Sequence, residues 1–250
     1  MADTIRIGGT GAALGTMRLL GEAYTQSNPG HTIKIIPSLG SGGGIKALQA
    51  GALDIAVIGR DLRAKEAQPG QVVIEYGKTP FLFATHSKVP ISNVSLEQVA
   101  EIYGGNQTAW PDGALIRVIL RPASESDIEL LSSISPAIKQ AVKFGLKREG
   151  MVMAATDIDS ADAIEHLPNS FGTSTLALVL SEKRALNILS LEGVTPSVET
   201  LANGTYRYTK NLSMLLTQQS SKTAREFVKF VQSLNGRKIL EQTGHYVSRK

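Results

Sequence analysis

Short apolar runs rich in β-branched residues alternate along the chain with segments of helical periodicity. Runs at residues 4–7, 32–36 and 115–120 predict strands, and each precedes a segment with helical character. A helix is expected over residues 12–26, because its apolar positions recur every three to four residues; the Asn-Pro-Gly sequence after it should end this helix. Repeated strand and helix alternation is typical of an α/β protein whose mostly parallel sheet is covered on both faces.

Other local signals extend this assignment. They predict a helix from Gly43, a buried strand at 53–58, a helix over 96–103 and an amphipathic helix over 224–231. Ser95 and Gln98 give the helix over 96–103 a capping-box sequence at its start. The pattern of polar and apolar residues therefore predicts α/β structure for most of the chain.

Two apolar segments, 80–85 and 212–216, flank a middle block of the chain and are expected to be strands that cross between two lobes. On this interpretation the first lobe is discontinuous and comprises residues 1–84 and 208–250. The second lobe comprises residues 85–207. Paired crossovers would form a hinge between the lobes.

Composition narrows the functional classes. The 250 residues are 42% apolar and carry a net charge of +4, without a long block of Lys and Arg, so we expect no nucleic-acid partner. The chain has no cysteine, which excludes thiolate chemistry and disulfides. No apolar run is long enough to span a membrane, and no export signal opens the sequence. We therefore expect a cytoplasmic protein or one whose signal has been removed.

Three polar or glycine-rich stretches follow predicted strands and precede predicted helices, at residues 8–12, 40–44 and 121–127. The first N–H groups of a helix lack intrahelical partners, and the helix dipole is positive at that end. Together the three stretches predict a site for an anion. A structural alternative stays open for each: the glycines can serve tight turns, and Ser124 with Glu125 and Asp127 can cap a helix and load its first turn with acid. The arginines also have structural alternatives, Arg60 with Asp61 or Asp54 and Arg121 with Glu125.

Enzymatic functions find little support in the sequence. No Gly-x-Ser-x-Gly elbow follows a strand, and the Gly40 stretch is neither a Walker loop nor a Gly-x-Gly-x-x-Gly fingerprint. The histidines lie in turn-like or terminal contexts: His31, His86, His166 and His245. A dense acidic group could suggest a metal site but fits a solvated helix better: Asp157, Asp159, Asp162 and Glu165. Trp110 is expected to be a loop anchor beneath Tyr103. We expect a binding protein without a metal or cofactor.

A set of short segments occurs in the order found in one known family: residues 40–46, 54–62, 102–105, 110–113, 170–172, 193–197 and 204–206. The chain resembles the phosphate-binding proteins of bacterial ABC importers, within the type II periplasmic binding proteins. The resemblance covers most of the chain and implies two α/β lobes that close on a tetrahedral oxyanion. It also implies an extracytoplasmic, periplasmic location, a membrane permease of an ABC importer as partner, and a monomer.

Carried over by position, the resemblance implies ligand contacts from both lobes. The first lobe would supply Thr10, Gly11 and Ala12 together with Ser41, Gly42 and Gly43. The second would supply Arg121, whose guanidinium can hold two oxygens of an anion, and the stretch Ser124, Glu125 and Ser126.

Two departures from the family pattern bear on the ligand. Arg60 and Asp61 stand where the family tends to have a Ser-Asp pair, and Glu125, Ser126 and Asp127 replace its Ser-Gly-Thr cluster. Carboxylates beside a bound anion are costly in a low-dielectric cleft. Alternatives to phosphate are therefore sulfate-like, molybdate-like or organic anions, a zwitterion that uses the carboxylates, or a module that has lost its ligand and serves interactions.

Overall fold

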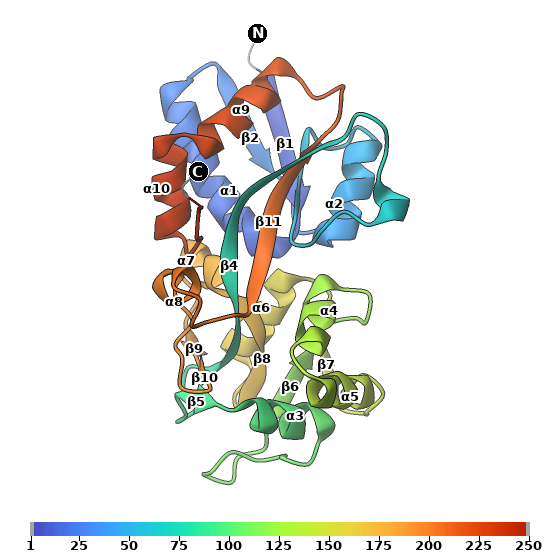
Figure 1. Ribbon diagram of the computed structural model, residues 1–250, viewed down its shortest axis with the longest axis vertical. Helices are drawn as coiled ribbons and strands as arrows, with labels where there is room; N and C mark the ends of the chain where they lie inside the picture. The colour runs from blue at the N-terminus through green and yellow to red at the C-terminus, as the bar shows by residue number, and fades with distance from the viewer. Residues whose placement is uncertain (1–2, 249–250) are drawn as a thin grey trace.

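The computed structural model describes residues 3–248 and has two lobes that lie one above the other in Figure 1. The strands are β1 (Asp3–Gly9), β2 (His31–Ile35), β3 (Ile55–Ile58), β4 (Val72–His86), β5 (Asn93–Val94), β6 (Arg117–Leu120), β7 (Val152–Met153), β8 (Ser170–Thr175), β9 (Leu186–Ile188), β10 (Ser190–Leu191) and β11 (Thr209–Leu216).

The helices flank these strands in both lobes. They are α1 (Gly11–Ser27), α2 (Gly40–Gln49), the short 3-10 helix Ala64–Glu66, α3 (Leu96–Gly104), α4 (Ser126–Ser133), α5 (Pro136–Gly145), α6 (Asp157–His166), α7 (Leu176–Glu182), α8 (Val198–Ala202), α9 (Lys222–Gln232) and α10 (Leu234–Gln242). No helix within residues 3–248 is long and apolar enough to cross a membrane.

A continuous sheet runs through both lobes in the order β2-β1-β3-β11-β4-β8-β6-β7, and β9 also pairs with β4. Pairing is parallel between β1 and its neighbours and between β6 and its neighbours, whereas β4 and β11 are antiparallel to the strands beside them. The long strand β4 pairs with β11 over residues 72–80 and with β8 over residues 81–85. Figure 1 shows β4 and β11 running side by side between the lobes. The expected α/β class and the two crossover strands are confirmed.

Each lobe has its own apolar core. In the first, Tyr24 packs edge-on against Phe227 and Phe230, which joins α1 to α9. In the second, Phe171 of β8 stacks on Phe83 of β4 at a ring separation of 5.7 Å. Burial of these aromatic faces stabilises each lobe separately.

Trp110 lies in the second core and is 3% exposed. Its indole N–H donates to Asn169 O over 3.1 Å, and its ring packs edge-on against Phe171. Tyr103 packs against the same phenyl ring. The anchoring role that the sequence suggested for Trp110 therefore operates through Phe171.

The sequence predicted the start of α3 correctly but not the start of α2. Ser95 Oγ accepts the N–H of Gln98 at 3.0 Å, and Gln98 Oε1 accepts the N–H of Ser95 at 2.9 Å, so the capping box of α3 is confirmed. The predicted start of α2 at Gly43 is wrong, because the helix begins at Gly40. A Cβ on Gly44 would lie 2.6 Å from the Cα of Gly9, so the glycines let α2 pack directly on β1. This tertiary contact outweighs the low helix propensity of glycine.

Candidate functional site

Helix N-termini from both lobes meet between the lobes. A Cβ on Gly11, at the start of α1, would lie 2.9 Å from Ile158 and 3.0 Å from Asp157, at the start of α6. Similarly, a Cβ on Gly40, at the start of α2, would lie 3.3 Å from the carboxylate of Glu125, which precedes α4. In Figure 1 the facing ends of α1, α2, α4 and α6 lie near the middle of the molecule, beside the crossover strands. Positive helix ends therefore gather where the lobes touch.

Four charged side chains are buried at this junction and form what we term the buried charge cluster: Arg121, Asp127, Asp157 and Lys210. Lys210 Nζ on β11 contacts Asp127 and lies 2.9 Å from Asp157 Oδ1. Arg121 Nη1 lies 3.6 Å from a carboxylate oxygen of each aspartate. Two cations and two carboxylates thus balance one another away from water, which a buried ionic group requires.

Asp157 of the second lobe accepts a hydrogen bond from the first lobe. The hydroxyl of Thr10 donates to Asp157 Oδ2 over 2.9 Å. Thr10 is the N-cap residue of α1 but makes no side-chain capping bond there. A carboxylate of the second lobe therefore occupies the donor that the resemblance assigned to an anionic ligand.

The cluster perturbs the protonation of its own members. Burial opposes the charge of Asp157, but the neighbouring Lys210 and Arg121 outweigh it and hold the pKa of Asp157 below its ordinary value. Burial, together with the charge of Asp157, raises the pKa of Asp127. Burial lowers the pKa of Lys210, yet the two aspartates outweigh burial and raise it overall. Lys210 is therefore a permanent cation at neutral pH.

Arg121 has unused hydrogen-bonding capacity. Its side chain is only 2% exposed, and its Nη2 donates to Ala155 O and to Glu125 Oε2, each over 3.2 Å. Its Nε and Nη1 are buried without a hydrogen-bond acceptor among the described residues. A buried donor without an acceptor costs about 1–3 kcal/mol, so an incoming acceptor would be stabilised here.

A cleft of about 470 Å³ opens beside this junction, and we term it the basic cleft. It is lined by Leu39, Ser41, Gly42, Gly43, Ile45, Lys46, Gln49, Arg60, Arg63, Lys65, Glu66, Ser124, Glu125 and Ser126. The cations outnumber the acids in this lining, and residues of both lobes contribute to it. The charge of this lining favours an anion, and the cleft has more than enough room for one of a few heavy atoms.

The PBP superfamily domain, as a sequence family, matches residues 1–235 of the chain. The chain belongs to the PBP superfamily. The phosphate-binding protein PstS of Borreliella burgdorferi is 25% identical over 214 residues, which are 82% of this chain and 76% of that protein. The family resemblance that the sequence suggested is thereby confirmed.

Solved structures of ABC transporter substrate-binding proteins share the fold. A putative phosphate ABC transporter substrate-binding protein from Clostridium perfringens, with bound phosphate, has a TM-score of 0.82 at 21% identity and covers 98% of this chain and all (100%) of its own. The substrate-binding domain of a putative molybdenum ABC transporter from Clostridium difficile has a TM-score of 0.59 at 13% identity, with 99% and 100% covered. The two-lobed α/β architecture is therefore that of known substrate-binding proteins of ABC transporters.

The residues assigned through the resemblance lie in four different environments in this PBP superfamily member. Ser41, Gly42, Gly43, Arg60, Ser124, Glu125 and Ser126 line the basic cleft. Arg121 belongs to the buried charge cluster and Thr10 donates a hydrogen bond to it, while Gly11 and Ala12 are buried in the first turn of α1. Asp61 is exposed and is not part of the cleft lining.

Arg60 has a different partner from the two considered in the sequence. Its guanidinium makes two hydrogen bonds of 2.7 Å to the carboxylate of Glu66. Asp54 instead pairs with Arg6, and Asp61 offers Arg60 only its backbone oxygen. The suggested Arg60 ion pairs are therefore wrong, and the hydrogen bonds from Arg60 help to lower the pKa of Glu66.

The helix-capping alternative for residues 124–127 also needs correction. The N-cap residue of α4 is Glu125, not Ser124, and its side chain makes no capping hydrogen bond. Asp127 does lie in the first turn, but it contacts Lys210. The suggested pair of Arg121 with Glu125 is confirmed.

Lys210 was missed by the sequence analysis, and Asp157 was considered only as part of an acidic helix. A lysine inside a strand whose other members are mostly buried was the available signal for Lys210. For Asp157 the local pattern was a helix start, which is also correct: Thr156 and Asp159 form a capping box for α6.

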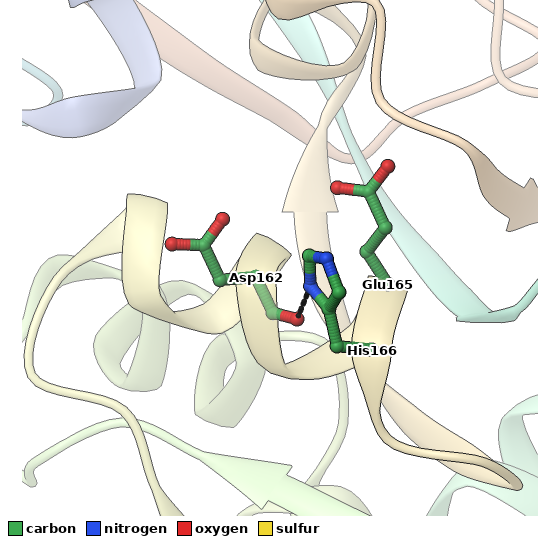
Figure 2. A group of neighbouring side chains, drawn as sticks. All are labelled: Asp162, Glu165 and His166. Carbon is green, nitrogen blue, oxygen red and sulfur yellow. Dashed lines mark hydrogen bonds between the residues drawn. The ribbon is translucent and has the colours of Figure 1, made fainter.

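The acidic surface of α6 is an ion-pair network. Asp162, Glu165 and His166 bring one potential ligand atom each within 4.8 Å of one another. Figure 2 shows that the hydrogen bond of His166 runs to the backbone oxygen of Asp162, at 2.9 Å, rather than to its carboxylate. Arg184 contacts Asp162 and lies 3.1 Å from Glu165 Oε2. Arg184 also pairs with Glu182, so one cation partly offsets the charge of these acids. The expected solvated helix is confirmed for Asp159, Asp162 and Glu165 but is wrong for Asp157, which is buried beside Lys210.

Proposed function

We propose that this protein is an extracytoplasmic solute-binding protein that captures a small oxyanion between its lobes and delivers it to the permease of an ABC importer. Phosphate is the first candidate ligand. The observation that carries the proposal is a cleft with a net positive lining whose residue Glu125 contacts the buried guanidinium of Arg121, a group with two nitrogens that lack a hydrogen-bond acceptor among the described residues. Charge-assisted hydrogen bonds from such a group hold an oxyanion strongly.

The ligand contacts we propose come from both lobes. Ser41, Gly42 and Gly43 would present the N–H groups of the first turn of α2, which lack intrahelical acceptors. Ser124 and Ser126 would donate hydroxyl groups from the opposite side of the basic cleft. Thr10, Gly11, Ala12, Arg60 and Asp61 complete the proposed set.

We propose lobe boundaries at residues 84 and 208, so that one lobe comprises 1–84 with 208–250 and the other 85–207. Separate apolar cores support this division. Residues 81–84 pack with the second core because β4 runs through both lobes. Bending of β4 and β11 would then open and close the basic cleft.

Phosphate is favoured among oxyanions because two of the relatives described above are named for phosphate. Because one similar structure is named for molybdenum, molybdate and tungstate are also tested as ligands. A thermal-shift screen against phosphate, sulfate, molybdate, tungstate, phosphonates and small carboxylates tests the proposal, because a ligand that binds only the native state raises the melting temperature. The absence of a shift with all of them would refute oxyanion capture and favour a module that serves interactions.

Arg121→Lys provides the matched variant for this screen. Lysine keeps the positive charge but lacks the planar guanidinium. The increase in melting temperature that the true ligand produces should therefore disappear or fall to a small fraction. Lys147→Gln, an exposed change on the same lobe, should leave the shift unchanged. An undiminished shift in Arg121→Lys would remove Arg121 from the site.

A zwitterionic ligand is the second candidate, because Glu66 and Glu125 bring carboxylates to the same cleft. These oxygens can accept from an ammonium group while Arg121 holds an acid group. Competition between an amino acid and phosphate at one pH separates the candidates, since a simple oxyanion gains nothing from the carboxylates. The proposed protein binds without turnover, needs no cofactor and acts as a monomer.

A further inference from the structure

Glu125 places its carboxylate at the point where a bound oxyanion would be held. Its Oε2 accepts from Arg121 Nη2 over 3.2 Å, and the same oxygen lies 3.3 Å from the Cβ position of Gly40, the first residue of α2. The carboxylate therefore lies between a buried guanidinium and a helix N-terminus, two features that attract an anion.

The charge balance shows that Arg121 does not need Glu125 as a structural partner. Within the buried charge cluster, Arg121 and Lys210 already face Asp127 and Asp157. Glu125 is a third carboxylate next to these two cations and two aspartates, so Arg121 and Lys210 alone do not balance it. Adding an anionic ligand beside it would place like charges together, which is unfavourable at short range.

Glu125 is also the member of this group that is free to move. Its side chain is 28% exposed, whereas that of Arg121 is 2% exposed and the aspartates of the cluster are buried. It lies in the lining of the basic cleft, so rotation of its side chain towards solvent would release Arg121 Nη2 without unpacking the core. The two nitrogens of Arg121 that lack a hydrogen-bond acceptor among the described residues, Nε and Nη1, lie in the same guanidinium.

We propose that Glu125 is a tethered competitor for the ligand: its carboxylate occupies the oxyanion position in the empty protein, and an oxyanion binds by displacing it. This inference rests on the proposed function, since it concerns the same cleft. Glu125 thereby sets the affinity of the site, and only an oxyanion that binds Arg121 and α2 better than a carboxylate does can enter.

Titration calorimetry with inorganic phosphate on three variants tests the proposal. Glu125→Gln keeps the shape of the side chain without its charge, and Glu125→Ser removes both, so that one variant remains if the other folds poorly. Glu149→Gln is the control, because Glu149 is an exposed acid of the same lobe. Unfolding temperatures of the apo proteins verify that each variant is folded.

The expected result is a decrease in the dissociation constant for phosphate of about tenfold or more in both Glu125 variants, and no change in Glu149→Gln. Binding by the Glu125 variants alone, with none by the wild type, also supports displacement. If the wild type binds phosphate and the Glu125 variants bind equally or more weakly, the competitor role is wrong and the proposed function stands. If no variant binds, both proposals fail for phosphate.

Discussion

Lys210 is a buried cation that two aspartates stabilise. It lies on β11 with a side chain only 2% exposed, and its ammonium group is held between Asp127 and Asp157. A Cβ on Gly59, the residue that follows β3, would lie 2.5 Å from Lys210 Cε, so the glycine at this position leaves room for the lysine side chain. The position is therefore built around a cation, although the strand itself is apolar.

Removing that cation should destabilise the protein strongly. Lys210→Met keeps the length of the side chain but leaves two buried carboxylates with only Arg121 as counter-charge, and we expect the free energy of unfolding to fall by about 3–5 kcal/mol. Urea unfolding measures the change. Lys222→Met is the control: that side chain is 91% exposed and its ion pair with Glu226 should contribute no more than about 1 kcal/mol. Equal effects of the two substitutions would contradict a structural role for the buried ion pairs.

His245 is a second buried titratable residue and lies outside the site. Its Nδ1 lies 3.1 Å from Leu240 O, and its Nε2 is buried without a partner among the described residues. Nδ1 therefore carries the proton that is donated, and a second proton on Nε2 would be buried unpaired. Burial accordingly lowers the pKa of His245 to about 4.

This shift makes stability depend on pH in a defined window. The ordinary pKa of 6.5 applies to the unfolded chain, so the unfolded state binds more protons than the native state between pH 6.5 and about pH 4. The stabilisation that comes from keeping His245 neutral is fully present above pH 6.5 and is lost as the pH falls. From this group we expect the free energy of unfolding to be about 2 kcal/mol lower at pH 5 than at pH 7. Urea unfolding of the wild type and of His245→Asn at both pH values measures how much of the pH dependence comes from His245. The same pH dependence in both proteins would show that His245 is not responsible.

At the scale of elements, α2 is positioned by a backbone contact. Gly44 lies against Gly9 of β1, and this contact fixes where the first turn of α2 meets the basic cleft. Gly9 itself has a φ of 136° and leaves no space for a side chain beneath Val57 O. The conformation of two glycines thus places the N–H groups proposed to bind the ligand.

Gly44→Ala should disturb both stability and binding. The new methyl group would lie 2.6 Å from the Cα of Gly9, so α2 must move away from β1, and we expect a loss of about 1–3 kcal/mol in unfolding free energy. The proposed ligand affinity should fall as well. In Gly42→Ala the methyl group would meet only Arg60 Nη2, at 3.8 Å, so the stability should stay the same or rise by up to about 1 kcal/mol. Thermal unfolding compares the two, and a Gly44→Ala protein as stable as Gly42→Ala would contradict the packing argument.

This contact also explains what the sequence could and could not predict. Helices such as α1 and α3 were predictable because apolar spacing and caps act within a few residues. The start of α2 was not, since a contact with β1 determines it. Likewise the pair of Arg121 with Glu125 is four residues apart and was predictable, whereas Lys210 meets Asp127 and Asp157 across 83 and 53 residues. No local pattern encodes that meeting.

At the scale of the whole molecule, polar side chains of the two lobes contact each other directly. Thr10 of α1 binds Asp157 of α6, and Arg63 forms an ion pair with Glu129 of α4. Arg63 also lies 3.5 Å from the backbone oxygen of Ser124. Figure 1 shows these helices facing one another across the junction. These polar contacts add to close packing elsewhere between the lobes, where Gly15 of α1 meets Ser181 of α7 and Gly244 meets Leu176 of α7. Polar contacts exchange with water more readily than packed apolar ones.

Weakening these contacts should open the empty protein. Thr10→Val combined with Glu129→Gln removes one hydrogen bond to a buried carboxylate, which contributes about 1.5–3 kcal/mol, and one exposed ion pair of at most about 1 kcal/mol. Valine matches threonine in shape, and Thr10 makes no capping bond to α1, so the helix itself is preserved. A change of this size shifts a two-state equilibrium between closed and open forms by more than tenfold.

Small-angle scattering of the ligand-free proteins measures the expected opening as an increase in the radius of gyration of the double variant. Glu149→Gln, which lies away from the junction, should scatter like the wild type. Urea unfolding of the double variant separates opening from unfolding, because a lobe movement leaves both apolar cores intact. An unchanged radius of gyration would mean that the crossover strands and the buried charge cluster hold the lobes closed without these two contacts.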